Sequence, residues 1–440
     1  MEYPKVLVLA IGRVNDSDSS SNGLLLRNIF ARFPRENLAQ IYSGGSNGDA
    51  GFFGHYYKLN AYDRWFGKLF FKYKSKSEEG GIHLFNRAVV KNQSKSVFLP
   101  FRRIFLNWFI DSGFYELIFR PRLSWRILKW ISEFKPDILF TQGYNLTFTW
   151  LPLMIDRKYN LPIIYYPTDD WPDRCYKYGL TKLSVFARLT LRNYTMASKK
   201  LVKSATVHLA FNYSMKNEYS KRYKTEFYVL MHGDDFKRFE SAVPRRSTDD
   251  NIYCFVCTGA FDYHRFPLID DLDAACKILN SNNIKCQTIV YSVNSLNELP
   301  DRIYEFHYVT FKKCPSHEDL VSFLRGADIL ILPERFGETS ASIRLSVSSK
   351  SHLFMFSGRP IIVYSDSRTG VAQYGKAKGW AEVVDIRDPE VLAKTIETLI
   401  KNRNKQEKLI ERARNTAMKN HQLSTIQDSF LKLLVAVVQQ

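Results

Sequence analysis

Short apolar runs alternate with amphipathic segments along most of this chain. Each run is mainly aliphatic and leads into a polar loop, which is typical of buried parallel strands. The segments between the runs carry apolar residues at helical spacing, and such strand–helix–strand units form right-handed crossovers in a parallel sheet. The pattern predicts strands at 5–10, 38–42, 136–140, 161–166, 205–210 and 227–230, and then at 253–257, 285–291, 309–311, 328–332, 360–364 and 381–384.

The segment 328–364 has the most specific chemistry of these units. An apolar strand leads into a polar loop, and a helix predicted at 352–357 ends at Gly358. Hydroxyl groups, positive side chains and the backbone N–H groups of a helix start favour an anion, so we expect a phosphate or diphosphate here. The alternative is a serine N-cap with solvated cations. The candidate binding residues are Glu338, Arg344, Ser348, Ser349 and Lys350.

Two further strand ends carry candidate site residues. The strand 253–257 leads to Gly259, which would let the backbone approach a ligand closely, and to Arg265, which would meet a phosphate. The strand 161–166 runs into Asp169 and Asp170, at the edge where ligands bind in open α/β sheets. We interpret this acidic pair as catalytic or ligand-binding. The alternative is that one aspartate caps the next turn or helix.

The segment 51–129 interrupts the regular pattern and is dense in aromatic and cationic residues. Such a mixture suits the headgroup region of an anionic membrane. It also suits single-stranded nucleic acid, or a helical insertion whose aromatics form ordinary core. We favour membrane contact. The clearest cation clusters are Lys72, Lys74 and Lys76, and Arg102 with Arg103.

Composition narrows the classes of protein that fit. The 440 residues include 63 Lys and Arg against 44 Asp and Glu, a net charge of +19, which indicates a negatively charged partner. No apolar run is long enough to predict a transmembrane helix, and the apolar N-terminus reads as a strand, not as a signal peptide. The six cysteines are scattered and form no disulfide pattern, which is consistent with the cytoplasm. Together with the expected membrane contact, this predicts a peripheral protein on the inner face of the membrane.

The polar stretch 245–251 divides the chain. We predict an N-terminal Rossmann-like domain at 1–240 with 51–129 as its insertion, a C-terminal Rossmann-like domain at 250–420, and a last helix at 421–440 that packs back on the first domain.

Several motifs together resemble a known family. The run SSKSHLFMFSGRPIIV resembles a branch of the family-4 type of retaining glycosyltransferases with the GT-B fold, and four other segments resemble that family in the same order: NGLLLRNIF with Asn22 and Gly23, IIYYPTDDW, HGDD and TGAFDYHR. The resemblance implies two Rossmann-like domains that face each other across a cleft. It also implies that Arg265 and Lys350 hold the diphosphate of the donor, that Asp169 or Asp170 lies near the reacting sugar, and that Asn22 and Gly23 form an acceptor or donor loop.

The chain departs from the family pattern at three places. Leu345 and Leu353 occupy the positions of a glutamate pair that contacts the ribose or sugar in many members, and Thr168 and Asp169 stand where a catalytic-loop histidine is common. The nucleotide of the donor is therefore open.

The resemblance implies an enzyme that moves a sugar from a nucleotide-sugar donor to a glycan or lipid-linked acceptor in surface polysaccharide synthesis, with retention of configuration. The second domain has no DxD-like pair at the expected diphosphate site, so we expect catalysis without a metal or other cofactor. The alternatives are a GT-B nucleotide-sugar epimerase and a non-enzymatic basic protein that binds membrane or nucleic acid. We expect a donor, an acceptor and an anionic membrane as partners, and no nucleic acid.

Overall fold

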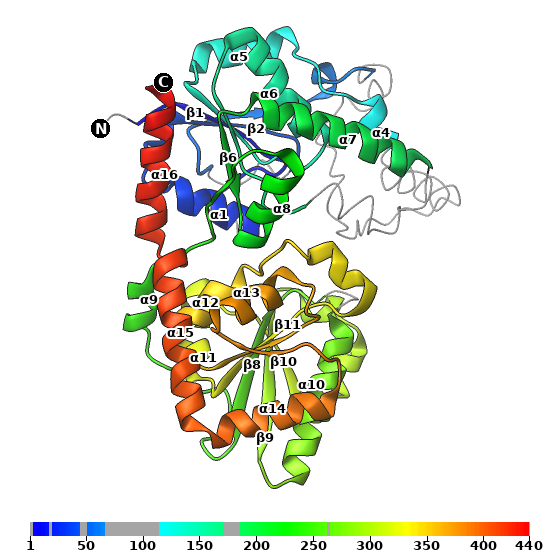
Figure 1. The fold of residues 1–440 in the computed structure, drawn as a ribbon, viewed down its shortest axis with the longest axis vertical. Helices are drawn as coiled ribbons and strands as arrows, with labels where there is room; N and C mark the ends of the chain where they lie inside the picture. The colour runs from blue at the N-terminus through cyan, green and yellow to red at the C-terminus, as the bar shows by residue number, and fades with distance from the viewer. Residues whose placement is uncertain are drawn as a thin grey trace. The chain divides into compact units, whose positions relative to one another are not determined.

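The computed structural model describes residues 3–16, 20–44, 51–66, 114–170, 185–261 and 265–439. The chain divides into two compact units: unit 1 comprises Met1–Leu230 with Gln427–Gln440, and unit 2 comprises Met231–Ile426. Each unit is built on one parallel sheet covered by helices (Figure 1).

The sheet of unit 1 has seven strands in the order β3-β2-β1-β4-β5-β6-β7. All neighbouring pairs are parallel. The chain order reverses between β1 and β4, and the carboxyl ends of strands at such a reversal are where open α/β sheets bind ligands. The strands are β1 (Val6–Leu9), β2 (Leu38–Tyr42), β3 (His55–Lys58), β4 (Ile138–Thr141), β5 (Ile163–Tyr165), β6 (Val207–Ala210) and β7 (Tyr228–Val229).

Strand β3 corrects one sequence prediction. Residues 51–129 were predicted as a helical insertion, rich in aromatic and basic residues, in the N-terminal domain, but β3 lies inside this range and pairs with β2. The strand reads HYYK and is exposed to half-buried, as an edge strand is, so it lacks the aliphatic run that marked the other strands. The predicted cation clusters Lys72–Lys76 and Arg102–Arg103 lie outside the described residues.

Four helices in the described part of unit 1, α1, α5, α6 and α8, begin with a side-chain cap. Ser20, Ser124, Asn145 and Asn212 each accept a hydrogen bond from a backbone N–H in the first turn. The helices are α1 (Ser21–Phe30), α4 (Phe114–Ile118), α5 (Trp125–Phe134), α6 (Leu146–Tyr159), α7 (Val185–Ser204) and α8 (Tyr213–Tyr223).

The C-terminal helix α16 (Leu423–Val438) contributes to the core of unit 1 with its part from Gln427 onward. Its Phe430 is 1% exposed and packs edge-on against Phe30 and Phe140, with ring centroids 5.2 and 5.9 Å away. Burying a side chain of this size contributes roughly 1.5–3 kcal/mol. The apolar contacts of Phe430 therefore hold the end of the chain in unit 1.

The sheet of unit 2 has six strands in the order β10-β9-β8-β11-β12-β13, again all parallel. The strands are β8 (Tyr253–Gly259), β9 (Cys286–Ser292), β10 (Val309–Lys313), β11 (Ile329–Pro333), β12 (Ile361–Tyr364) and β13 (Glu382–Val384). The helices are α9 (Phe236–Ser241), α10 (Phe266–Ser281), α11 (His317–Gly326), α12 (Lys350–Phe356), α13 (Gly370–Lys378), α14 (Pro389–Lys401) and α15 (Arg403–His421).

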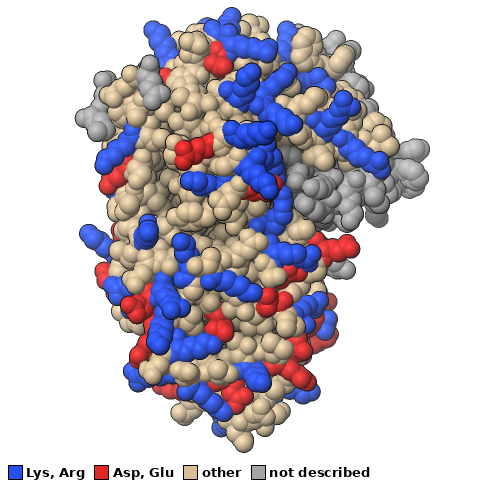
Figure 2. Space-filling view, viewed as in Figure 1, with Lys and Arg blue, Asp and Glu red and all other residues tan. Residues whose placement is uncertain are grey.

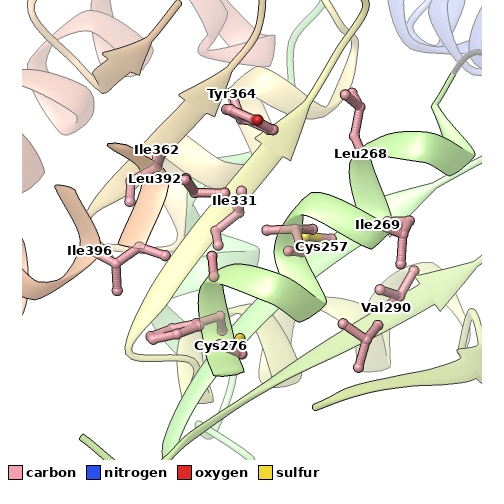
Figure 3. Close-up of a cluster of buried hydrophobic side chains, with 14 of the residues drawn as sticks. Cys257, Leu268, Ile269, Cys276, Val290, Ile331, Ile362, Tyr364, Leu392 and Ile396 are labelled. Carbon is pink, nitrogen blue, oxygen red and sulfur yellow. The ribbon is translucent and has the colours of Figure 1, made fainter. Parts of the chain in front are cut away.

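The core of unit 2 lies between its sheet and the helices α10 and α14 (Figure 3). Ile331 and Val290 come from the sheet, Leu272 from α10 and Ile396 from α14, and all four are fully buried. Cys254 and Cys257 are buried as free thiols on β8, and no group of His, Cys, Asp or Glu in the described part of the chain is arranged to hold a metal ion. Nor does any described helix combine the length and the hydropathy needed to cross a bilayer.

Candidate functional site

A lysine and a glycine that are far apart in the sequence meet at the carboxyl edge of the sheet of unit 2. Gly259 ends β8 with a φ of +135°, a conformation that favours glycine. A Cβ atom built on Gly259 would lie 2.6 Å from Nζ and 3.2 Å from Cδ of Lys350. The side chain of Lys350 therefore lies directly over Gly259, and any larger residue would compete with it. β8 and β11 are neighbours, and this pairing brings the two predicted residues together.

Arg265, the third predicted residue at this edge, forms an ion pair with a buried carboxylate. Its Nη2 and Nε atoms donate to Oε2 of Glu334 at 2.6 and 3.1 Å, and its Nη1 donates to the carbonyl of Ala260 at 3.1 Å. Glu334 follows β11 directly and is only 2% exposed. Two cations, Arg265 and Lys350, therefore surround one anion, and the excess of positive charge suits a phosphate group.

The electrostatic balance at Glu334 is explained by these neighbours. Burial raises the pKa of the Glu334 carboxyl. The positive charges of Arg265 and Lys350, together with hydrogen bonds from Arg265 and Ser348, lower the pKa by more than burial raises it. The pKa of Glu334 therefore lies below its ordinary value. Glu334 is thus ionised at neutral pH and holds Arg265 in a fixed orientation.

The other predicted residues of this loop are spread more widely. Glu338 is exposed within a short 3-10 helix at Gly337–Ile343, and Arg344 follows that helix as its C-cap. Ser348 and Ser349 are half-buried beside the start of α12, where Ser348 accepts a backbone hydrogen bond from Ser351. Helix α12 spans only seven residues, so its dipole is small. The charged side chains of Arg265 and Lys350 therefore contribute more to the positive potential at this edge than the helix dipole does.

We expect Glu334→Gln to lower the free energy of unfolding at pH 7 by about 3 kcal/mol, because it breaks a buried ion pair. The lowered pKa of Glu334 means that its stabilisation is complete above the ordinary carboxyl range and is lost as the pH falls through the pKa of the folded state. The difference between wild type and variant should therefore disappear in acid. Urea titrations at a series of pH values measure it.

Glu338→Gln is the matched control, because this exposed carboxylate lies in the same loop. A surface substitution of this kind is expected to change stability by less than about 0.5 kcal/mol. Equal effects of the two substitutions would contradict the assignment of Glu334.

A second polar cluster lies at the carboxyl edge of the sheet of unit 1. Asn22, in the first turn of α1, accepts hydrogen bonds at Oδ1 from Nε2 of Gln142 at 2.6 Å and from the hydroxyl of Tyr144 at 3.2 Å. The hydroxyl of Tyr144 also hydrogen-bonds Thr168, the residue before Asp169. Gly23 is buried beside Asn22, and its N–H donates to Oγ of Ser20 at 3.0 Å. The predicted residues Asn22 and Asp169 thus belong to one edge of unit 1.

The two predicted aspartates have different surroundings. Asp170 is 2% exposed and accepts two hydrogen bonds from Arg222 at 2.8 and 3.0 Å and one from the hydroxyl of Tyr219 at 2.9 Å. Asp169 is half-buried, and its Oδ1 accepts the backbone N–H of Asp170 at 3.1 Å. Asp170 therefore holds α8 against the loop after β5, whereas Asp169 keeps a partly exposed carboxylate at the edge.

Four residues of these two edges were not among the predicted site residues: Gln142, Tyr144, Arg222 and Glu334. Three of them follow a strand closely, and attention to every polar residue directly after an apolar run would have found them. Arg222 lies in the last turn of α8 and carries no such signal.

No protein-family model and no curated protein sequence matches this chain. Several solved structures of other proteins do align with it. Sucrose-phosphate synthase from Thermosynechococcus elongatus aligns with a TM-score of 0.61 at 12% identity and covers 98% of both chains. HepE from Anabaena, in complex with UDP-glucose, aligns with a TM-score of 0.59 at 14% identity over 99% of this chain and 100% of its own. WaaG, a glycosyltransferase of lipopolysaccharide biosynthesis, aligns with a TM-score of 0.54 at 13% identity over 97% and 98%.

The chain has the GT-B fold. The alignments run over nearly the whole chain, so they include both units with their seven-stranded and six-stranded sheets. The predicted fold class of two Rossmann-like domains is confirmed. Identities of 12–14% establish the fold alone, and the roles of individual residues rest on the geometry described above.

Proposed function

We propose that this GT-B protein is a glycosyltransferase that uses a nucleotide-sugar donor. The observation that carries the proposal is the meeting of Lys350, Gly259 and Arg265 at the carboxyl edge of unit 2. Gly259 allows the side chain of Lys350 to lie close to the backbone. The positive charges of Lys350 and Arg265 together exceed the single negative charge of the buried Glu334. HepE, which has the same fold, was solved with UDP-glucose.

The chemistry of the leaving group explains why cations are needed at this position. Transfer of the sugar releases a nucleoside diphosphate, and negative charge builds on its terminal phosphate as the bond to the sugar breaks. Arg265 would donate two parallel hydrogen bonds to phosphate oxygens, and Lys350 would act as a point charge. These side chains would stabilise the leaving group without a metal ion. Retention of configuration is part of the proposal through the family resemblance of the sequence.

The acceptor would bind at the edge of unit 1. Asn22, Gln142, Tyr144 and Thr168 offer uncharged amide and hydroxyl groups, which suit the hydroxyls of a sugar. Asp169 would lie near the reacting hydroxyl. We propose a glycan or lipid-linked acceptor of surface polysaccharide synthesis, presented at an anionic membrane on its cytoplasmic side.

A thermal-shift screen with UDP, GDP, ADP and CMP tests this proposal. A nucleotide present at 100 times its dissociation constant should stabilise the protein by about 2.7 kcal/mol. We expect one nucleoside diphosphate to raise the melting temperature and the others to act weakly. Absence of a shift with all four would contradict a nucleotide site.

Incubation with the matching nucleotide sugar then separates two enzyme classes. A glycosyltransferase gives product only when an acceptor is present, apart from slow hydrolysis. A nucleotide-sugar epimerase converts the donor with no acceptor, and that outcome would replace the proposed reaction.

A further inference from the structure

Helix α7 has an unusual distribution of charge. Its 20 residues, VFARLTLRNYTMASKKLVKS, include no Asp or Glu. The helix α15 has nearly the same length, 19 residues, and also many cations, but it includes Glu407 and Glu411. Lys and Arg side chains gather over unit 1 on the face shown in Figure 2, where Figure 1 places α7.

One face of α7 is buried and the other is exposed to solvent. The inner face is buried on unit 1 through Ala187, Thr190, Tyr194, Ala197 and Leu201. The outer face is exposed along the whole helix, about 30 Å at 1.5 Å per residue. It presents cations and aliphatic side chains together: Val185, Arg188, Leu189, Arg192, Met196, Lys199, Lys200 and Lys203.

The outer face of α7 also carries exposed aliphatic residues. Val185 is 73% exposed, and Leu189 and Met196 are each 46% exposed. They lie between the cations, at helical spacing on one side of α7. A helix with cations and aliphatic residues on its solvent face is suited to the boundary between lipid headgroups and acyl chains. Nucleic acid would gain little from aliphatic side chains, because bases stack on aromatic rings.

The inner face of α7 connects this surface with the candidate acceptor edge. The hydroxyl of Tyr194 donates a hydrogen bond to the carbonyl of Gly143, which lies between Gln142 and Tyr144. Helix α6, which begins directly after this loop, packs against α7. A surface that binds along α7 is therefore held close to the residues that would bind the acceptor.

We infer that the outer face of α7 is the surface through which this protein binds an anionic lipid bilayer. Arg188, Arg192, Lys199 and Lys203 contact the headgroups, and Leu189 and Met196 enter the boundary below them. The inference deepens the membrane contact of the proposed function. It assigns that contact to a described helix, separate from the segment 67–113, which lies outside the described residues.

Vesicle co-sedimentation of the full-length protein, without nucleotide, tests the inference. The variant Arg188→Gln, Arg192→Gln, Lys199→Gln, Lys203→Gln should bind mixed phosphatidylglycerol and phosphatidylcholine vesicles at least about 100-fold more weakly than wild type, and the loss should shrink as salt rises. The matched control replaces four exposed cations of α15, Arg403, Lys408, Arg412 and Lys419, by Gln. It removes the same charge and should bind like wild type.

The aliphatic residues require a separate variant. Leu189→Gln with Met196→Gln leaves the charge unchanged and should reduce vesicle binding about ten-fold, at low and high salt alike. The charge-retaining variant Arg188→Lys, Arg192→Lys should bind like wild type and shows that the helix tolerates substitution. Melting temperatures confirm that each variant is folded.

Three outcomes would overturn the inference. One is equal loss in the α7 and α15 variants, which would mean that only net charge matters. Another is unchanged binding in both α7 variants. The third is that the protein binds polyuridylate through the α7 cations but does not bind phosphatidylglycerol vesicles. That result would mean that the partner of α7 is a nucleic acid. Since no nucleotide is present, failure of the proposed glycosyltransferase activity would leave these results unchanged.

Discussion

Replacing Lys350 with alanine is expected to weaken the binding of the nucleoside diphosphate by about ten-fold or more. A hydrogen bond to a charged group contributes roughly 1.5–3 kcal/mol, and at 25 °C a loss of 1.4 kcal/mol is a factor of ten. Nζ of Lys350 lies over Gly259, which ends β8 at the carboxyl edge of the sheet of unit 2. Isothermal titration with the diphosphate found in the thermal-shift screen measures the effect.

The matched control for this prediction is Lys313→Ala. Lys313 is the exposed last residue of β10, so it lies at the carboxyl edge of the same sheet, two strands away from β8. Its removal lowers the charge equally and should change the affinity less than two-fold. Equal losses from Lys350 and Lys313 would indicate a general electrostatic attraction. Unchanged affinity in a folded Lys350→Ala protein would remove this residue from the site.

Most of both sheets could be predicted from sequence, because a strand buried on both faces must be apolar along its length. β1, β4, β8, β11 and β12 are all such strands, and each was predicted within a few residues of its observed bounds. β3 could not be found in this way. It is an edge strand of polar and aromatic residues, and its place in the sheet depends on its pairing with β2.

The candidate site was only partly predictable for a related reason. Gly259, Arg265 and Lys350 carry a local signal, since a glycine or cation after a strand suggests an anion. Glu334 also follows an apolar run directly, but it carries the opposite charge, and its ion pair with Arg265 forms only in the folded sheet. From the sequence alone, Asp169 and Asp170 also cannot be distinguished. The difference between them arises from Arg222, 52 residues after Asp170, whose guanidinium donates two hydrogen bonds to the Asp170 carboxylate.

This difference leads to the second prediction, in which asparagine at the two positions has different consequences. Asp170→Asn should lower the free energy of unfolding by about 3 kcal/mol, because it leaves the half-buried Arg222 facing an amide where it had a carboxylate with two hydrogen bonds. Asp169→Asn should change stability by less than about 0.5 kcal/mol, since its carboxylate is partly exposed. It should instead lower turnover, with the affinity for the nucleotide unchanged, because the donor phosphates would bind in unit 2.

Glu218→Gln is the control for this pair, because Glu218 is the second and more exposed carboxylate bonded to Arg222, at 2.9 Å. An exposed i,i+4 pair contributes roughly 0.3–0.5 kcal/mol, so this variant should melt close to wild type. Urea unfolding separates the effects on stability, and steady-state kinetics at saturating donor separate the effects on turnover. If Asp170→Asn is as stable as Glu218→Gln, the buried ion pair does not hold α8 in place. If Asp169→Asn and Asp170→Asn both keep wild-type turnover, the loop after β5 is only a turn and the reacting groups must come from elsewhere on the edge.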